Sequence, residues 1–231
     1  MNSIEKTKKQ CVIFDMDGVI FDSERACLFT WTEAASKYGL KDLEKVFNKC
    51  IGTNKNQTHQ IVEDAYSKEF GAGFADKLLE QSSIIFHERY DGGRLPIKKG
   101  VVEILEHLRE NRIRCAIASS TRKAAVEEEL GAAGLLEYFE QIIGGDSVKI
   151  SKPDPEIYLL ACKAMKSEPK DTFAIEDSYN GIRSANAAGM RPIMVPDMIP
   201  ADEEMRRLSE VICEDLFAVS EYLNKALSIE G

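Results

Sequence analysis

The sequence contains cysteine but none of the spacings that would give cysteine a structural or redox role. Its six cysteines are scattered from Cys11 to Cys213, and no two of them form a C-x-x-C pair. Cys11 and Cys115 lie in apolar runs typical of buried strands, where free cysteine behaves as a small hydrophobic residue. This usage argues against a disulfide framework and favours a reducing, cytoplasmic environment.

Long apolar runs and clusters of basic residues are also missing. No stretch is long and apolar enough to span a membrane, and residues 1–10 are polar and lysine-rich, unlike a signal peptide. Asp and Glu outnumber Lys and Arg by 39 to 30, which gives a formal net charge of −9. An acidic chain without a basic stripe is a poor candidate for binding nucleic acid or an anionic membrane. We therefore expect a cytoplasmic protein that binds neither.

One stretch, Cys11 to Ser23, organises the rest of the chain; it reads C-V-I-F-D-M-D-G-V-I-F-D-S. Its first four residues are apolar and β-prone, which predicts a strand buried on both faces. Asp15 and Asp17 follow at once, and Gly18 lets the chain turn. Loops at the carboxyl ends of strands line the ligand crevice of open α/β sheets, and carboxylates there are costly unless a cation meets them. Asp15 and Asp17 are thus the first candidates for catalysis.

Strands and helices alternate from residue 100 onward. The pattern predicts strands at 114–118, 141–143, 172–175 and 191–195, with helices between them. Such alternation predicts an α/β fold: a three-layer, Rossmann-like core in which helices cover both faces of a parallel sheet.

The segment between the first strand and residue 93 has no strand-like run. Helical patterns cover 24–38, 43–50, 57–70 and 74–90, the first with Ser23 as its N-cap. A glycine-rich loop at 91–96 then returns the chain to the core. We predict an all-helical cap domain at 23–92, inserted into a discontinuous core domain formed by 1–22 and 93–231 and hinged near both junctions.

Polar residues recur where the predicted strands end and in one loop that opens a helix: Asp15, Asp17, Ser119, Glu176, Asp177 and, in the loop, Lys152. Neighbouring parallel strands would bring these groups into one crevice. Two like charges ~4 Å apart repel by about 4 kcal/mol even at an effective dielectric of ~20, so Lys152 and a divalent cation are expected there. Oxygen ligands without His or Cys favour a hard ion, and Mg²⁺ in particular where phosphate is bound as well.

Four pieces, F-D-M-D-G-V-I-F-D-S, I-A-S-S-T, S-K-P-D-P and I-E-D-S-Y-N-G-I, occur in this order. Together they resemble the four motifs of the haloacid dehalogenase-like hydrolase superfamily. The helical insert after the first motif resembles the small helical cap of its β-phosphoglucomutase-like phosphatase branch. Four ordered motifs in their strand-end contexts are far more specific than a lone D-x-D.

The resemblance implies roles for the acidic residues. Asp15 would be the nucleophile that forms an aspartyl-phosphate, and Asp17 would protonate the leaving alcohol and then activate water. The carboxylates of Asp15 and Asp177 and the backbone carbonyl of Asp17 would hold Mg²⁺. Glu176 would be a direct or an indirect partner of the same ion.

The resemblance also implies phosphate-binding and substrate-binding residues. The Ser119 hydroxyl and the Lys152 ammonium would bind the oxygens of the transferring phosphoryl group. In the cap, Lys55 follows I-G-T-N, at a place where relatives have a basic residue that faces the substrate. The implied partner is a small phosphorylated metabolite, a sugar phosphate first of all, and the implied assembly is a monomer or a weak dimer.

Several alternatives to a Mg²⁺-dependent phosphatase remain open. Dehalogenases lack the second aspartate, so Asp17 argues against that activity. The mutase branch has a histidine early in the first cap helix, and ungapped counting from Asp22 places Cys27 there. The mutase signature is therefore incomplete, and β-phosphoglucomutase activity is kept as the alternative to phosphatase activity. The other classes are a catalytically silent binding module and a D-x-D glycosyltransferase. The retained motifs argue against both, and the lack of a nucleotide-binding signal argues against the glycosyltransferase.

Each candidate residue also has a purely structural interpretation. The alternatives are an acidic turn or calcium loop at Asp15 and Asp17, a helix N-cap at Ser119, a surface lysine at Lys152, and compensation of a helix dipole by Glu176 and Asp177.

Overall fold

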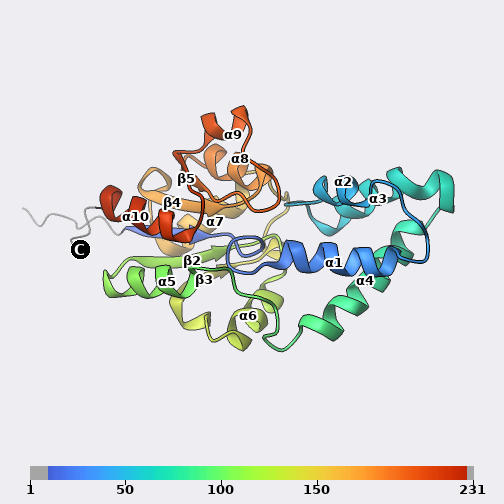
Figure 1. Cartoon of the computed structure of the whole chain (residues 1–231). Helices are drawn as coiled ribbons and strands as arrows, with labels where there is room; N and C mark the ends of the chain where they lie inside the picture. The colour runs from blue at the N-terminus through green and yellow to red at the C-terminus, as the bar shows by residue number, and fades with distance from the viewer. Residues whose placement is uncertain (1–9, 228–231) are drawn as a thin grey trace, which may run out of the picture.

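A six-stranded parallel sheet forms the centre of the molecule in the computed structural model, which describes residues 10–227 (Figure 1). The strand order is β3-β2-β1-β4-β5-β6, so the first strand in sequence lies in the middle. The strands are β1 (Cys11–Phe14), β2 (Arg114–Ala118), β3 (Phe139–Ile143), β4 (Thr172–Glu176), β5 (Arg191–Met194) and β6 (Val211–Ile212). The register pairs Phe14 with Ile117 on one side and with Ile175 on the other.

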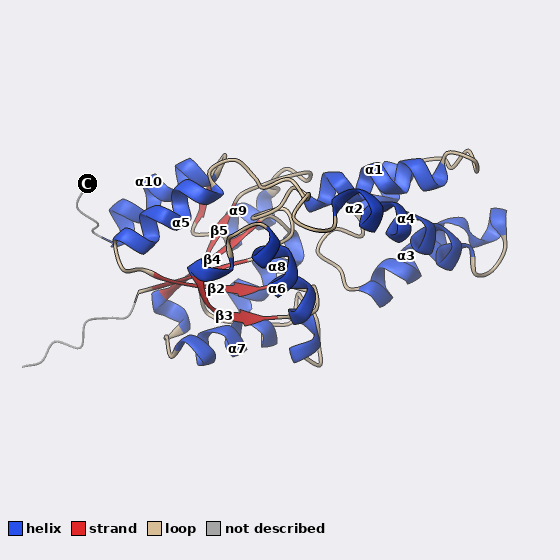
Figure 2. Cartoon of the chain, turned by 90° about the horizontal axis from the view of Figure 1, so that it is seen from below, coloured by secondary structure: helices blue, strands red, loops and turns tan. Residues whose placement is uncertain are grey.

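Helices cover both faces of this sheet, as the sequence predicts. One face packs against α5 (Val101–Glu110), α6 (Lys123–Ala132) and α10 (Leu216–Leu227), and the other against α7 (Glu156–Met165) and α8 (Tyr179–Ala187). Figure 2 shows α5 and α10 opposite α7 across the strands. Val12 and Phe14 enter the first hydrophobic cluster while Cys11 and Ile13 enter the second, which is the alternation expected of a doubly covered strand. The three-layer α/β core is confirmed.

Short elements complete the core. Helix α9 (Glu203–Leu208) packs on α8 through Met205. Single 3-10 turns lie at η1 (Leu136–Tyr138), η2 (Gly145–Ser147) and η3 (Pro169–Asp171). Within the described residues, no helix is both long enough and apolar enough to cross a membrane.

Four helices stand to one side of the sheet, beyond the carboxyl ends of its strands (Figures 1 and 2). They are α1 (Ser23–Ala35), α2 (Leu43–Asn48), α3 (Lys55–Phe70) and α4 (Phe74–Tyr90). They share a hydrophobic cluster of their own, which includes Trp31, Phe47, Val62 and Leu78. Among the described residues, this segment contributes no strand to the sheet. The division into a cap at 23–92 and a core stays a prediction that this arrangement supports.

The two connections between core and helical segment are hydrogen-bonded to each other. The Asp22 N–H donates to the Pro96 carbonyl at 2.8 Å, the Lys98 N–H donates to the Ile20 carbonyl at 2.9 Å, and Phe21 and Ile97 form an antiparallel bridge. The chain therefore leaves and re-enters the core at one joined point, which is where the sequence places the hinge.

The sequence-based boundaries differ from the structure in a few places. Ser23 is the first residue of α1 and not its cap; the residue before it, Asp22, makes no capping hydrogen bond with its side chain. Helix α1 ends at Ala35, short of the predicted Tyr38. Helix α3 begins two residues earlier than predicted because Asn54 and Gln57 form a reciprocal capping box. Strand β6 was not predicted, because two residues carry no periodicity.

Candidate active site

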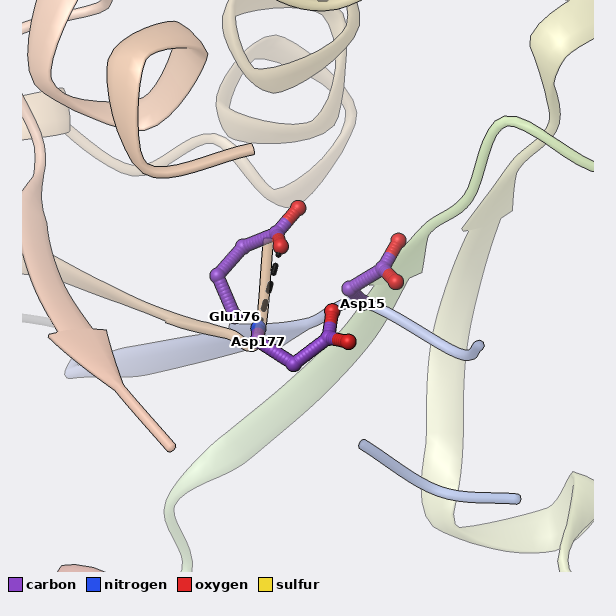
Figure 3. Close-up of side chains that lie close together, drawn as sticks. All are labelled: Asp15, Glu176 and Asp177. Atoms are coloured by element: carbon purple, nitrogen blue, oxygen red, sulfur yellow. Dashed lines mark hydrogen bonds between the residues drawn. The ribbon is translucent and has the colours of Figure 1, made fainter. Parts of the chain in front are cut away.

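The candidate site lies where β1 and β4 end side by side. Connections from these strands run to opposite halves of the sheet, so this is the place where an open α/β sheet forms its ligand crevice. The Asp15 N–H donates to the Ile175 carbonyl at 2.9 Å, which fixes the start of the loop after β1. Asp15, Glu176 and Asp177 are buried, and one carboxylate oxygen from each lies within 4.8 Å of the others (Figure 3).

Lys152 is the buried cation of this cluster, with a side chain only 3% exposed. Its ammonium donates to Asp15 Oδ1 at 2.7 Å, to Glu176 Oε1 at 2.6 Å and to the Ala118 carbonyl at 3.1 Å. These three acceptors use all three of its N–H groups and come from the ends of β1, β4 and β2. The alternative of an ordinary surface lysine is wrong, because the loop before α7 folds under the strand ends.

Glu176 is held from both of its oxygens. Oε1 accepts from Lys152 and, at 3.0 Å, from the Tyr158 hydroxyl. Oε2 accepts from the Asp177 N–H at 3.1 Å and from the N–H and hydroxyl of Ser178 at 3.2 and 3.0 Å. In Figure 3 the Asp177 carboxylate lies beside Asp15, and the Glu176 side chain curls round so that its carboxylate lies above the Asp177 backbone, to which the dashed line joins it. Ser178 caps α8 by accepting from the Gly181 N–H, so a local role for Glu176 and Asp177 at that helix end is not required.

The Asp17 carboxylate accepts hydrogen bonds from two hydroxyls. Asp17 Oδ2 accepts from Thr121 Oγ1 at 3.0 Å and from Ser119 Oγ at 3.4 Å. The Ser119 hydroxyl oxygen in turn accepts from the Thr121 N–H at 3.0 Å. The residue at the N-cap of α6 is Arg122, so the N-cap alternative for Ser119 is wrong. The structure thus brings Ser119 to Asp17, and it adds Thr121 as a contact that the sequence did not single out.

The electrostatics of the cluster leave room for another cation. Burial raises the pKa of Asp15 to about 8, with Lys152 opposing the rise and Glu176 and Asp17 adding to it. Burial, with Glu176 and Asp15, raises the pKa of Asp177 well above its usual range. Burial opposes the charge of Lys152, but Asp15 and Glu176 outweigh it and hold the lysine pKa well above its usual range. One ammonium therefore faces three buried carboxylates, and an all-oxygen donor set of this kind fits a hard divalent ion.

A sequence profile of the haloacid dehalogenase-like hydrolase family matches residues 12–195, which include every residue of this cluster. The chain belongs to that family. Its resemblance to known members extends beyond the motifs. A phosphorylated carbohydrates phosphatase from Thermotoga maritima is 33% identical over 185 residues, which cover 80% of this chain and 83% of that protein.

Solved structures show the same fold. β-Phosphoglucomutase from Clostridium difficile superposes with a TM-score of 0.70 at 22% identity, over 95% of this chain and 99% of that one. CbbY from Rhodobacter sphaeroides, solved in complex with phosphate, superposes with a TM-score of 0.73 at 24% identity, over 90% and 95%. The predicted membership of the family is confirmed, and the hydrolase has relatives that are named phosphatases.

One loop of the helical segment, between α2 and α3, lies close to the site. Asn54 Nδ2 donates to Ser151 Oγ at 2.8 Å, next to Lys152. A Cβ on Gly52, which has φ +70°, would lie 2.7 Å from Ser178 Oγ, next to Asp177, so the loop backbone approaches the core closely. Lys55 is exposed and begins α3 directly after this loop. Its substrate contact stays a prediction, for which this position gives support.

Two residues of α1 also interact with the site. Glu24 was not singled out from the sequence; burial, then Asp17 and Asp15, raises the pKa of its carboxyl to about 8. The pKa of the Cys27 thiol is raised as well, by burial first and then by Glu24 and Asp17. Ungapped counting from Asp22 therefore assigns a neutral thiol to the place of the mutase histidine, and this assignment stays a prediction. The three histidines of the chain contact Asp76, Asp91 and Asn224 instead, outside this cluster.

Gly181 makes a sharp test of how tightly Glu176 is held. A Cβ at this α8 position would lie 1.8 Å from the Glu176 carboxyl carbon. We expect Gly181→Ala to displace Glu176, to lower the free energy of unfolding by about 1–3 kcal/mol and to reduce turnover. Chemical denaturation and a phosphatase assay measure both effects.

Gly131→Ala is the matched control for this substitution. Gly131 lies in α6, where a Cβ would meet nothing closer than a Leu136 methyl at 3.9 Å. Alanine should stabilise that helix by up to about 1 kcal/mol and leave turnover unchanged. Equal effects of the two variants would contradict the tight enclosure of Glu176.

Proposed function

We propose that this hydrolase is a Mg²⁺-dependent phosphatase that removes phosphate from a small phosphorylated carbohydrate through an aspartyl-phosphate on Asp15. The observation that carries the proposal is the position of Asp15. Its carboxylate lies at the end of the central strand, 2.7 Å from the Lys152 ammonium and beside Asp177. A buried carboxylate between a fixed cation and further oxygen ligands is suited to attack a phosphorus atom whose oxygens those groups neutralise.

The other residues of the crevice fit the remaining steps. Asp17 follows two residues later, beyond the start of the turn, and is only partly buried. There it can give a proton to the leaving alcohol and later take one from water. Ser119 and Lys152 would donate to the phosphoryl oxygens, and their contacts to Asp17 and Asp15 keep these donors pointed into the crevice.

The donor set supports a metal ion as well. Asp15, Asp177 and the backbone carbonyl of Asp17 would hold Mg²⁺, and Glu176 supports the site by fixing Lys152 and the backbone of Asp177. A bound Mg²⁺ would neutralise phosphoryl charge and orient the ester. Gly18 fits this arrangement, because a Cβ there would lie 2.2 Å from Asp177 Oδ2 and push the carboxylate aside.

Asp177→Asn should weaken Mg²⁺ binding and turnover together, because it removes one anionic ligand with little change in shape. Titration of activity against Mg²⁺ concentration, with calorimetric Mg²⁺ binding in parallel, measures both. Wild-type activation by Mg²⁺ in this variant would remove Asp177 from the ligand set.

The proposed substrate class rests on the named activity of the Thermotoga relative and on the cap. A phosphorylated carbohydrate has hydroxyls and, in some cases, a second anionic group, which residues of the helical segment could bind. Glu24, Lys55 and the Gly52–Asn54 loop are placed for such contacts. We propose Lys55 as the cap residue that meets the substrate's anionic side.

A panel of sugar phosphates, other phosphate esters and a non-phosphorylated control, assayed for phosphate release with and without Mg²⁺, tests the proposed function. We expect Mg²⁺-dependent release from sugar phosphates. With β-glucose 1-phosphate, glucose as the product supports the phosphatase, and glucose 6-phosphate supports the alternative of a β-phosphoglucomutase. No release from any ester would favour the third alternative, a silent binding module.

A further inference from the structure

Tyr158 is fully buried beneath the candidate site and was not among the residues singled out from the sequence. It lies in the first turn of α7, the helix that follows the Lys152 loop. Its hydroxyl donates to Glu176 Oε1 at 3.0 Å. Its ring lies below the lysine, with Lys152 Nζ 5.0 Å from the ring centroid. One side chain therefore contacts both members of the buried Lys152–Glu176 pair.

Glu176 competes with Asp15, the proposed nucleophile, for the ammonium of Lys152. Glu176 Oε1 accepts from Lys152 at 2.6 Å, slightly closer than the 2.7 Å contact from Lys152 to Asp15 Oδ1. In a buried environment an unshared carboxylate oxygen attracts an ammonium strongly. The Tyr158 hydroxyl occupies the same Oε1 and takes part of its hydrogen-bonding capacity, which weakens the pull of Glu176 on Lys152.

The tyrosine ring limits the lysine in another direction. The ammonium donates its three N–H groups to Asp15, Glu176 and the Ala118 carbonyl. The Tyr158 ring faces the same ammonium, 5.0 Å from its nitrogen. An aromatic face attracts a cation and offers no directional acceptor, so it supports the ammonium without drawing a proton away from the crevice.

We propose that Tyr158 is a positioning residue of the phosphoryl-transfer site, which divides Lys152 between Glu176 and Asp15 so that the ammonium points at the nucleophile. The effect of Tyr158 on catalysis rests on the proposed phosphatase function. Its effect on the position of Lys152 does not, because that position is a property of the fold. Tyr158 acts through Lys152 and Glu176, the two site residues that it contacts.

Tyr158→Phe is the decisive variant, because it keeps the ring and removes only the hydroxyl. We expect kcat with para-nitrophenyl phosphate to fall about tenfold, the size of one lost hydrogen bond to a charged group, with KM changed less than twofold. Tyr158→Leu removes the ring as well and should lower kcat further. If the leucine variant does not fold, Tyr158→Phe decides alone.

Tyr66→Phe is the matched control. Tyr66 is buried in the cap, and its hydroxyl donates to the Lys41 carbonyl at 3.0 Å, far from the cluster. It should lose the hydrogen bond of a buried tyrosine hydroxyl to a backbone carbonyl without any change in kcat. A kcat for Tyr158→Phe within twofold of wild type, or an equal loss in Tyr66→Phe, would overturn the positioning role.

Crystal structures of wild type and Tyr158→Phe separate this inference from the proposed function. In the variant, Lys152 Nζ should keep its contact with Glu176, and its distance to Asp15 Oδ1 should lengthen beyond hydrogen-bond range. An unmoved lysine overturns the inference even if the enzyme is an active phosphatase. A displaced lysine in a protein that hydrolyses no ester supports the inference and rejects the proposed function.

Discussion

Asp15→Asn abolishes formation of a phosphoenzyme, whereas Asp17→Asn yields one that forms and decays slowly: this is the largest effect that we expect. Asp15 lies at the end of β1, beside Lys152 and Asp177, and its carboxylate must attack phosphorus directly. An amide is a far poorer nucleophile than a carboxylate, so the asparagine variant should show no turnover above background.

Asp17 has a different task, and its replacement should cost less. Its side chain accepts hydrogen bonds from the hydroxyls of Thr121 and Ser119, whereas Asp15 accepts from Lys152. Asp17→Asn keeps the nucleophile and the backbone carbonyl but removes the proton donor and base. General acid–base catalysis contributes ~10²–10⁴-fold, and a loss of about that size is expected.

An activated phosphate donor separates the two roles. Acetyl phosphate has a good leaving group and needs little protonation, so it should phosphorylate Asp15 in the Asp17→Asn variant, where hydrolysis of the adduct is slow. Mass spectrometry should find one added phosphoryl group on a peptide that contains Asp15. An adduct in Asp15→Asn, or one located on Ser119, would show that the nucleophile is misassigned.

Lys152→Met should give the second largest effect, on both activity and stability. Methionine matches the lysine stem in length but leaves Asp15 and Glu176 without the ammonium that lies 2.7 and 2.6 Å from them. Removing one member of a buried ion pair typically costs about 3–5 kcal/mol of stability. Loss of one preorganised donor at a transition-state oxygen typically costs ~10²–10³-fold in kcat.

Lys149→Met controls for the loss of a lysine from the same loop. Lys149 is exposed and lies outside the buried cluster, so its replacement should leave kcat and the unfolding midpoint near wild type. Denaturant unfolding and phosphate-release assays on both variants measure the contrast. A Lys152→Met enzyme that is as stable as Lys149→Met would contradict the central place of Lys152 in the cluster.

Most of this site can be predicted from the sequence because the carboxyl ends of parallel strands lie at one edge of a sheet. Residues that follow parallel strands meet at one edge, and Asp15, Ser119 and Asp177 do so through β1, β2 and β4. The burial of Lys152 had no such signal, since a lysine in a loop is usually exposed; only its motif marked it.

The contacts that sequence analysis missed depend on how helices are placed. Tyr158 falls on the apolar face of α7 and is indistinguishable by pattern from a residue that merely fills the core. Its hydroxyl matters only because the first turn of α7 places it 3.0 Å from Glu176 Oε1, at the end of β4. Thr121 is similar: it is one of several polar residues after β2, and the turn before α6 decides which of them faces Asp17.

The strand order has a consequence for how the molecule is made. Among the described strands β1 is synthesised first, yet it lies at the centre of the sheet. Cys11 can pair only after Arg114 on one side and Thr172 on the other have been synthesised. Until both partners have been synthesised, β1 is an apolar segment with two unpaired strand edges. Such a segment can aggregate or bind a chaperone. The helices of the cap, whose contacts are local in sequence, can form meanwhile. The cluster of Asp15 and Asp177 can therefore form only after β4 has been synthesised, because Asp15 follows β1 and Asp177 follows β4 in the sequence.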